Sequence, residues 1–233
     1  MDDFEDIVER VIAQIDPACQ YLARNDIAAL RSRGAGSWPD LLAVLDDQVA
    51  GEDRAKACWL LGRTGDERAF RPLIAALHDP DPRLRGEAAR ALGALGSPRA
   101  VPGLIAVLQA DTDSGTRMAA AYSLGLLGDH RAVDPLLARL ADTSEDRGVR
   151  GLAAEALTGP GERRAVPGLI AALADSSAEV RFWAAFALGE LADPAALSAL
   201  QQLAQSDEAT LPGWWSVSDE AAAAIERIRA RPS

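Results

Sequence analysis

The sequence has few of the residues that most often carry chemistry or close a covalent framework. Among its 233 residues there are two Cys and two His, and eleven are Trp, Tyr or Phe. Cys19 and Cys58 lack metal-ligand spacing and form no disulfide framework, which favours a reduced, cytoplasmic chain. A zinc or iron site needs more ligands than His78 and His130 supply, so we predict no metal and no cofactor.

Signals for membranes, nucleotides and nucleic acids are also missing. No run reaches the roughly 18 apolar residues of a membrane helix, and the N-terminus is acidic where a signal peptide is basic. A Gly-x-x-x-x-Gly-Lys-Ser/Thr loop is absent, and Lys56 is the only lysine in an Arg-rich chain, as in GC-rich bacterial genomes. The net charge of −11 repels phosphate backbones. We therefore expect neither nucleic acid nor membrane as a partner.

What the chain does contain is a repeat of about 32 residues. Its key leucine recurs at steps of 31, 32, 33 and 31 residues, at Leu61, Leu92, Leu124, Leu157 and Leu188. An Arg lies seven residues before each key leucine, at Arg54, Arg85, Arg117, Arg150 and Arg181. Each unit is predicted to hold two helices. The first runs through a Pro-x-Leu-Ile-type phrase, with Pro in the first turn. The second runs through an Arg-x-x-Ala-Ala phrase that ends at glycines.

These phrases resemble the HEAT-like repeats first described in phycobilisome lyases, with the pattern V-R-x-x-A-A-x-A-L-G-x-L-G-D-x-R-A-V-P-x-L-I-A-A-L. The likeness covers residues 54–205 well. It implies an all-α fold, a right-handed α-solenoid of HEAT-like helix pairs. Thr158 and Gly159 depart from the pattern in the fourth unit, and Gly115 enters an enlarged turn. Such repeats serve many functions, so the resemblance specifies the fold more than the activity.

The two ends depart from the repeat, as solenoid caps must. We expect an N-terminal helical cap over residues 1–38, HEAT-like repeats over 39–206, and a C-terminal loop with a capping helix over 207–233. The loop carries Trp214 and Trp215. These two side chains either extend a binding surface or cover the last core layer, and the sequence leaves both alternatives open.

One stripe of the second helices is predicted to bind a partner. A helical wheel places Phe182, Trp183 and Phe186 opposite the side that holds Leu188. Exposed apolar patches mark interaction sites, and Trp, Tyr and Arg dominate binding hot spots. The predicted partner-binding residues are Trp59, Arg90, Tyr122, Glu155, Phe182, Trp183, Phe186, Trp214 and Trp215. Because the Ala-rich helices are slim, we expect the stripe on the concave side. The alternative is that the aromatics pack on each other or on the cap.

The repeated Arg lies near the buried side of each second helix and therefore needs a partner. We expect an inter-repeat ladder in which Asp66, Asp129 and Asp193 accept from these arginines. A motif repeated in every layer indicates scaffold rather than catalysis.

The sequence predicts no catalytic residue, and Cys58 stands where other units have a core Ala. We therefore expect a protein that is not an enzyme, a scaffold or adaptor that binds a protein or peptide along its aromatic-rich concave face. Its oligomeric state stays open. The resemblance implies one alternative, a bilin-lyase-like enzyme or a chaperone for a hydrophobic cofactor, because bilin lyases attach a linear tetrapyrrole. HEAT-like DNA glycosylases use a basic groove, which Glu87, Glu155 and Glu220 on this stripe do not provide.

Overall fold

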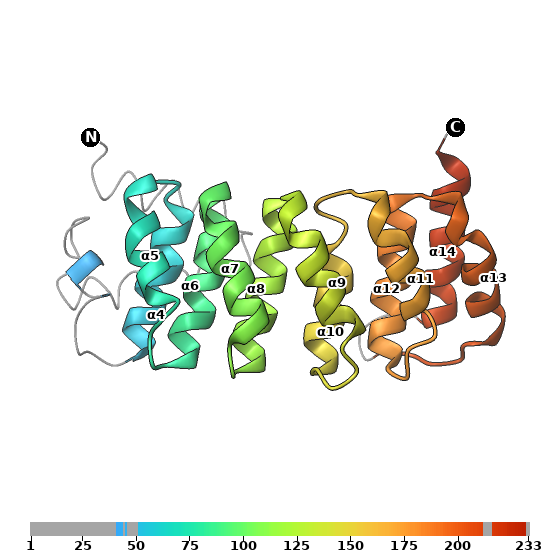
Figure 1. The fold of residues 1–233 in the computed structure, drawn as a ribbon, viewed down its shortest axis with the longest axis horizontal. Helices are drawn as coiled ribbons and strands as arrows, with labels where there is room; N and C mark the ends of the chain where they lie inside the picture. The colour runs from blue at the N-terminus through green and yellow to red at the C-terminus, as the bar shows by residue number, and fades with distance from the viewer. Residues whose placement is uncertain (1–40, 44, 46–50, 212–215, 232–233) are drawn as a thin grey trace, which may run out of the picture. The chain divides into compact units, whose positions relative to one another are not determined.

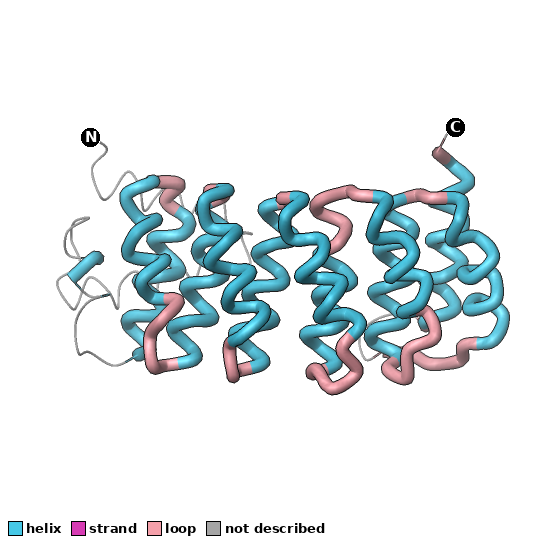
Figure 2. The backbone as a smooth tube through the Cα atoms, viewed as in Figure 1, coloured by secondary structure: helices cyan, strands magenta, loops and turns pink. Residues whose placement is uncertain are grey.

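The computed structural model describes residues 41–43, 45, 51–211 and 216–231. Within them the regular structure is helical, and the β-type pairing is one isolated antiparallel bridge between Thr210 and Ser216 (Figure 2). The chain forms two compact units, Met1–Gly103 and Leu104–Ser233, and each is described by itself. The predicted all-α solenoid of helix pairs is confirmed.

In unit 1, second helices and a first helix pack together as the repeat predicts. Its complete helices in the described residues are α4 (Gly51–Arg63), α5 (Phe70–Ala76) and α6 (Pro82–Leu95), and α7 (Val101–Ala110) begins there and ends in unit 2. Helices α4 and α5 both pack on α6. The key leucines Leu61 and Leu92 are fully buried, as is Leu73 of the first helix α5.

Unit 2 contains two layers of helices (Figure 1). The second helices are α8 (Ser114–Leu127), α10 (Arg147–Ala156), α12 (Ala178–Leu191) and α14 (Val217–Ala230). The first helices are α9 (Val133–Ala141), α11 (Val166–Ala172) and α13 (Leu197–Ser206). Each second helix packs on the next one, and α9, α11 and α13 pack on α10, α12 and α14 respectively. Fully buried leucines from both layers meet between them, namely Leu124, Leu136, Leu157, Leu169, Leu188 and Leu200.

Helix ends are set by short polar side chains and by glycine. The Asp113 carboxylate accepts from the Thr116 N–H at 2.8 Å and so satisfies a free donor at the start of α8. Gly96 and Gly128 end α6 and α8 with φ of 73° and 61°, in the left-handed region that glycine adopts without strain. Ala192 occupies the same position after α12, with φ of 51°.

Glycine directly follows four of the five key leucines, and at Gly62, Gly125 and Gly189 it has a packing role. In α6 and α8 this glycine lies within the helix, and the helix ends at the next glycine, Gly96 or Gly128. A Cβ placed on Gly125 would lie 2.9 Å from the Cα of Ala156, and one on Gly189 would lie 2.9 Å from the Cα of Ala224. Successive second helices of unit 2 therefore approach each other too closely for any larger residue at these positions.

The predicted arginine ladder exists, with different acidic partners from those expected. Arg150 is buried and pairs with Asp175, with 3.3 Å between Nη1 and Oδ1. Arg181 pairs with Asp207 at 2.5 Å, and the Arg181 Nη1 donates to the Asp175 carbonyl at 2.8 Å. Equivalent ion pairs join Arg54 to Asp79 in unit 1 and Arg117 to Glu145 in unit 2. Each of these four arginines therefore ties its own repeat to the turn between the two helices of the next repeat.

The partners predicted from sequence are wrong because those acids have local roles. Asp66 and Asp129 accept from the backbone N–H two residues later and pair with Arg68 and Arg131. Asp193 likewise accepts from the Ala195 N–H. All three acids cap a short 3-10 turn before a first helix. The acids that pair with the ladder arginines lie in the turn between a first helix and the following second helix.

The predicted N-terminal cap over residues 1–38 lies outside the described residues. At the other end, α14 packs on α12 and α13 and buries its apolar side, including Val217, Ile225 and Ile228. The division of the chain at residues 38 and 206 stays a prediction.

Candidate functional site

The second helices of unit 2 present a surface that is rich in aromatic and apolar side chains. It consists of Tyr122 and Leu126 on α8, Leu152 and Glu155 on α10, and Trp183 and Phe186 on α12. We call these six residues the unit 2 surface. The two residues on each helix are three or four positions apart in the sequence, so they lie on the same face of that helix. Tyr122 and Leu126 are 46% and 56% exposed, and they are the large hydrophobic side chains that the described residues leave exposed.

Phe182 does not belong to this surface, which corrects the sequence prediction. Its side chain is only 1% exposed. Gly86 and Gly151, which also follow the repeated Arg directly, are buried in the same way. The wheel allowed only a narrow buried arc, but a second helix contacts a neighbour on each side as well as a first helix. The buried arc is therefore wider, and Phe182 is a core residue.

A small cavity lies between α8 and α10. Its volume is about 140 Å³, and its lining includes Tyr122, Leu126, Leu152 and Glu155. Pockets that bind drug-sized ligands measure roughly 300–1,000 Å³. The cavity alone therefore has room for only part of such a ligand, and the remainder would lie along neighbouring side chains.

Those neighbours are the aromatic residues of α12. The Trp183 and Phe186 rings meet edge to face, with centroids 5.7 Å apart. Trp183 lies over Gly151, where a Cβ would come within 3.0 Å of the indole Cδ1. Gly151 is four residues before Glu155, so the indole contacts α10 about one helical turn before Glu155 in the chain. Glycine at 151 makes room for the indole beside the cavity.

At the far side of Phe186 lies a charged group that the sequence analysis only partly found. The Arg227 guanidinium carbon lies 5.4 Å from the centre of the Phe186 ring. Arg227 pairs with the fully buried Glu220 and approaches Glu190 at 3.7 Å. Glu220 and Arg227 are seven residues apart, on one face of α14. That spacing is the signal that would have added Arg227 to the stripe.

Glu155 is the unusual residue of the unit 2 surface. No hydrogen bond or ion pair to its carboxylate occurs within the residues that the structure describes. Burial disfavours the charged form and raises the pKa of Glu155 above its ordinary value. A half-buried carboxylate among apolar side chains therefore lines the cavity, and no residue in the described part of the chain pairs with it.

The other predicted residues lie elsewhere or cannot be placed. Trp59 and Arg90 are on α4 and α6 of unit 1, where the Arg63 guanidinium carbon lies 5.6 Å from the Trp59 ring centre. Arg90 pairs with Glu87 on its own helix at 2.8 Å. Trp214 and Trp215 lie outside the described residues. That these residues bind a partner stays a prediction, as does the concavity of the stripe.

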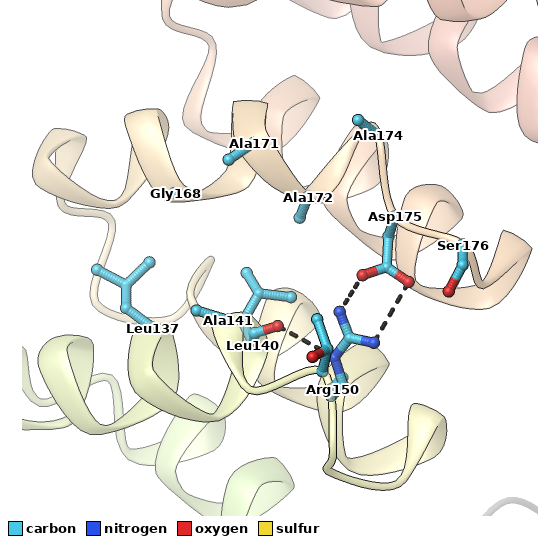
Figure 3. A pocket seen from close by; sticks show the side chains of 11 residues that line it. Leu137, Leu140, Ala141, Arg150, Gly168, Ala171, Ala172, Ala174, Asp175 and Ser176 are labelled. Carbon is cyan, nitrogen blue, oxygen red and sulfur yellow. Dashed lines mark hydrogen bonds and ion pairs between the residues drawn. The ribbon is translucent and has the colours of Figure 1, made fainter.

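A second, larger groove lies in the first-helix layer of unit 2, away from the residues predicted to bind a partner (Figure 3). Its volume is about 470 Å³, and leucines and alanines of α9 and α11 form most of its wall. The Arg150–Asp175 pair lies at its edge, with the two side chains directed toward each other. That pair belongs to the ladder. The groove therefore has a mainly apolar wall, and the two charged side chains at its edge are paired with each other.

Groups capable of redox or metal chemistry are sparse in the described part of the chain. It contains no cluster of three His, Cys, Asp or Glu residues placed to hold a metal ion. Burial raises the pKa of the Cys58 thiol to about 12, and His78 and His130 are exposed. None of the helices described is long and apolar enough to cross a membrane.

Comparison with known proteins identifies the repeat and a set of relatives. A family model described as HEAT repeats matches residues 38–125, 100–158 and 133–212. The bilin biosynthesis protein PecE of Nostoc sp. (strain PCC 7120 / SAG 25.82 / UTEX 2576) is 46% identical over 81 residues, which cover 30% of this chain and 32% of that protein. The chain spans about a third of the length of the curated relatives it matches.

Solved structures show the same architecture at low sequence identity. The complex of CpcE and CpcF of phycocyanin lyase from Nostoc sp. PCC7120 contains a chain with a TM-score of 0.50 and 22% identity, and the match covers 95% of this chain and 94% of that one. A designed armadillo repeat protein in complex with the peptide (KR)4 matches with a TM-score of 0.58 and 19% identity, over 82% and 98% of the two chains. These likenesses show the fold alone.

The relatives also correct one expectation from the sequence. The prediction that the chain is not an enzyme is contradicted by its similarity to two proteins of bilin biosynthesis, at 46% and 43% identity over 81 residues. Scarce His and Cys argue against a metal site or a thiol nucleophile. They do not argue against a reaction in which the protein holds and orients a reactive ligand. Because the repeat model matches well over half of its length, the chain belongs to the HEAT-repeat family.

Proposed function

We propose that this chain is a lyase-type HEAT-repeat protein that binds an open-chain tetrapyrrole, a bilin, on the unit 2 surface. One observation carries the proposal: exposed Tyr122 and Leu126 continue into Trp183 and Phe186, in a chain that is related to bilin biosynthesis proteins. Tyr122 and Leu126 are exposed and lie beside two half-buried aromatic rings, and exposed apolar patches commonly mark interaction sites.

The physical match is between flat, conjugated rings and aromatic side chains. Aromatic residues bury about 150–250 Å² each and favour offset-stacked or edge-to-face contacts. Trp183 and Phe186 already contact each other edge to face, with an angle of 84° between their planes. Two pyrrole rings of a twisted tetrapyrrole can therefore lie against two differently oriented faces, while a third ring enters the cavity beside Glu155.

Within a lyase-type reaction, the proposed role of the surface is to hold and orient the ligand. The residues with polar side chains that line the cavity are Tyr122, Glu155 and Thr158, and the Thr158 hydroxyl donates to the Glu155 carbonyl at 2.8 Å. These groups can donate, accept or move protons. The acceptor protein would supply the nucleophile, and the unit 2 surface would exclude water from the bound ligand.

A protein partner is the second part of the proposal. The CpcE structure is that of a complex with CpcF, and we propose that this chain also acts together with another protein.

The proposal is tested by titrating the purified protein with biliverdin and following the ligand's visible absorbance. Wild type is expected to shift the spectrum with saturation. The double variant Tyr122→Ala/Leu126→Ala should bind at least about tenfold more weakly, because each truncation removes about 1–2 kcal/mol of apolar contact. Both side chains are largely exposed, so circular dichroism should show an unchanged fold.

Trp59→Ala is the matched control, since it removes an aromatic residue from a second helix of unit 1. It should leave the titration unchanged. If wild type gives no saturable shift, bilin binding is wrong. If Trp59→Ala and Tyr122→Ala/Leu126→Ala weaken binding equally, the unit 2 surface is not the site.

A further inference from the structure

The position of Glu155 in the repeat shows that the fold does not need a carboxylate there. Glu155 lies five residues after the repeated Arg150, and the equivalent residues in the other second helices are Trp59, Arg90, Tyr122 and Phe186. These side chains share neither charge nor shape. The position is therefore free to vary with function, and a carboxylate at 155 requires its own explanation.

The surroundings of Glu155 make that carboxylate costly in the free protein. Its cavity is formed mainly by Tyr122, Leu126, Leu152 and Ala156, and burial raises the pKa of Glu155. A partly desolvated charge without a partner destabilises a protein. Other carboxylates near this surface have basic partners among the described residues. Glu190 and Glu220 approach Arg227, and Glu179 approaches Arg147. The Glu155 carboxylate thus resembles half of an interaction that a ligand completes.

We propose that the Glu155 carboxylate accepts hydrogen bonds from the ring N–H groups of the bound tetrapyrrole and keeps the ligand in its protonated, cationic form. This inference rests on the proposed function and names the contact that orients the ligand. The two oxygens of a carboxylate offer about four acceptor sites, enough for N–H groups of adjacent rings. Anionic acceptors favour the charged state of a donor beside them.

The size of the cavity limits how the proposed ligand would lie on the unit 2 surface. The cavity between α8 and α10 is too small for a whole tetrapyrrole, at about 140 Å³. One end of the ligand therefore enters it with its N–H edge toward Glu155. The rest continues toward Trp183, whose indole lies over Gly151 on the same helix. Tyr122 and Leu126 close the other side of the inserted end.

The test compares biliverdin binding by wild type, Glu155→Gln and Glu155→Asp between pH 5 and 9. Gln keeps the shape of Glu but removes its charge, whereas Asp keeps the charge. We expect Glu155→Gln to bind about ten- to a hundredfold more weakly, since hydrogen bonds to a charged acceptor contribute about 1.5–3 kcal/mol. The absorbance change that marks protonation of the bound ligand should move to lower pH in Glu155→Gln and be partly restored in Glu155→Asp.

Glu226→Gln is the control, because it removes the same charge from an exposed position on α14. It should leave both affinity and the pH profile unchanged. If wild type binds and Glu155→Gln binds equally with the same pH profile, the role of Glu155 is wrong while bilin binding stands. If Glu155→Gln weakens binding without moving the pH profile, ligand protonation by Glu155 is overturned. If wild type does not bind biliverdin, the proposed function is wrong, and this inference with it.

Discussion

Glu155 is half-buried and Cys58 is fully buried, but of the two only Glu155 lines a cavity that could hold a ligand. Glu155 faces a cavity on the unit 2 surface, whereas Cys58 is fully buried in unit 1. Burial raises the pKa of both groups. For a carboxyl at neutral pH this destabilises the charged form, and for a thiol it keeps the group neutral and unreactive.

Replacing Glu155 by Gln is expected to stabilise the free protein at pH 7. The folded-state pKa of Glu155 is raised, so the native state loses stability as pH rises from the unfolded pKa through the folded one. Gln avoids that loss. Because the carboxylate is still partly solvated, the gain should stay below about 1 kcal/mol. Urea unfolding at pH 7 and below pH 4 measures it, and the gain should vanish at the lower pH. A lower stability of Glu155→Gln at pH 7 would show that the carboxylate has a structural partner.

Cys58 is expected to resist thiol reagents in the folded protein. Its pKa of about 12 leaves almost no thiolate at pH 8, and the side chain is fully buried. In a Cys19→Ser variant, which leaves Cys58 as the single thiol, Ellman's reagent should react only after denaturation. Rapid reaction of the native variant would contradict the burial of Cys58.

At the scale of elements, the end of α12 carries a local strain that a single change should relieve. Ala192 adopts φ of 51° where Gly96 and Gly128 end the equivalent helices. A left-handed conformation costs a non-glycine residue roughly 1–2 kcal/mol, partly offset by the greater flexibility of glycine in the unfolded chain. Ala192→Gly is therefore expected to raise the free energy of unfolding by up to about 1 kcal/mol. Thermal unfolding measures this, with Ala195→Gly in the following 3-10 turn as the control that should not gain stability.

The ladder between repeats predicts a contrast between a buried and an exposed ion pair. Arg150 and Asp175 have side chains only 7% and 8% exposed. Removing one partner leaves the other charge buried and typically costs 3–5 kcal/mol, so Arg150→Ala should lose about 3 kcal/mol or more. Arg164→Ala breaks an exposed contact with Asp134 and should lose about 0–1 kcal/mol. Equal losses in urea unfolding would mean that the ladder is not the main tie between these repeats.

Most of the helices and their buried positions could be predicted from the sequence, because the same pattern recurs in each repeat. The recurrence of Leu124, Leu157 and Leu188 identified core layers that are fully buried in unit 2. The ladder partners could not be found in this way. Several acids lie within reach along the chain, and only the three-dimensional turn shows that Asp175 faces Arg150 while Asp129 caps a local turn.

The candidate site was predicted less completely than the fold. Tyr122 is exposed, as the helical wheel indicated, but Trp183 and Phe186 are half-buried. They contact each other, and Phe186 contacts Arg227 of α14, as in the alternative in which the aromatics pack on each other or on the cap. Phe182 is buried, because the burial of a second helix depends on its neighbours on both sides, which a single-helix wheel omits. The cavity beside Glu155 depends on the spacing between α8 and α10, which no property of one helix encodes.

At the scale of the whole molecule, the acidic side chains of the ladder should make stability sensitive to acid. A hydrogen bond from Arg181 lowers the pKa of Asp207. Burial alone would raise the pKa of Glu145, but hydrogen bonds, including one from Arg117, hold it below its ordinary value. Groups with lowered folded pKa contribute stability above their unfolded pKa of about 4 and lose it as pH falls through the folded value.

The free energy of unfolding should therefore be nearly constant from pH 8 to 6 and fall steadily below about pH 4. Arg181→Met removes the cause of the lowered Asp207 pKa, so it should unfold more easily at pH 7 and lose less stability between pH 7 and 3. Urea unfolding at pH 7, 5 and 3 compares the two proteins. Parallel losses in wild type and Arg181→Met would show that this pair does not contribute to the acid response.

The repeats of unit 2 share buried leucines and the arginine ladder, whereas the unit 2 surface varies from repeat to repeat, and we propose that it holds a bilin. Isothermal titration with biliverdin of wild type, Trp183→Ala/Phe186→Ala and Trp59→Ala, each shown by circular dichroism to be folded, tests it most directly. We predict saturable binding by wild type and Trp59→Ala, and its loss in Trp183→Ala/Phe186→Ala. Equal binding by all three proteins would contradict the account and place the ligand elsewhere.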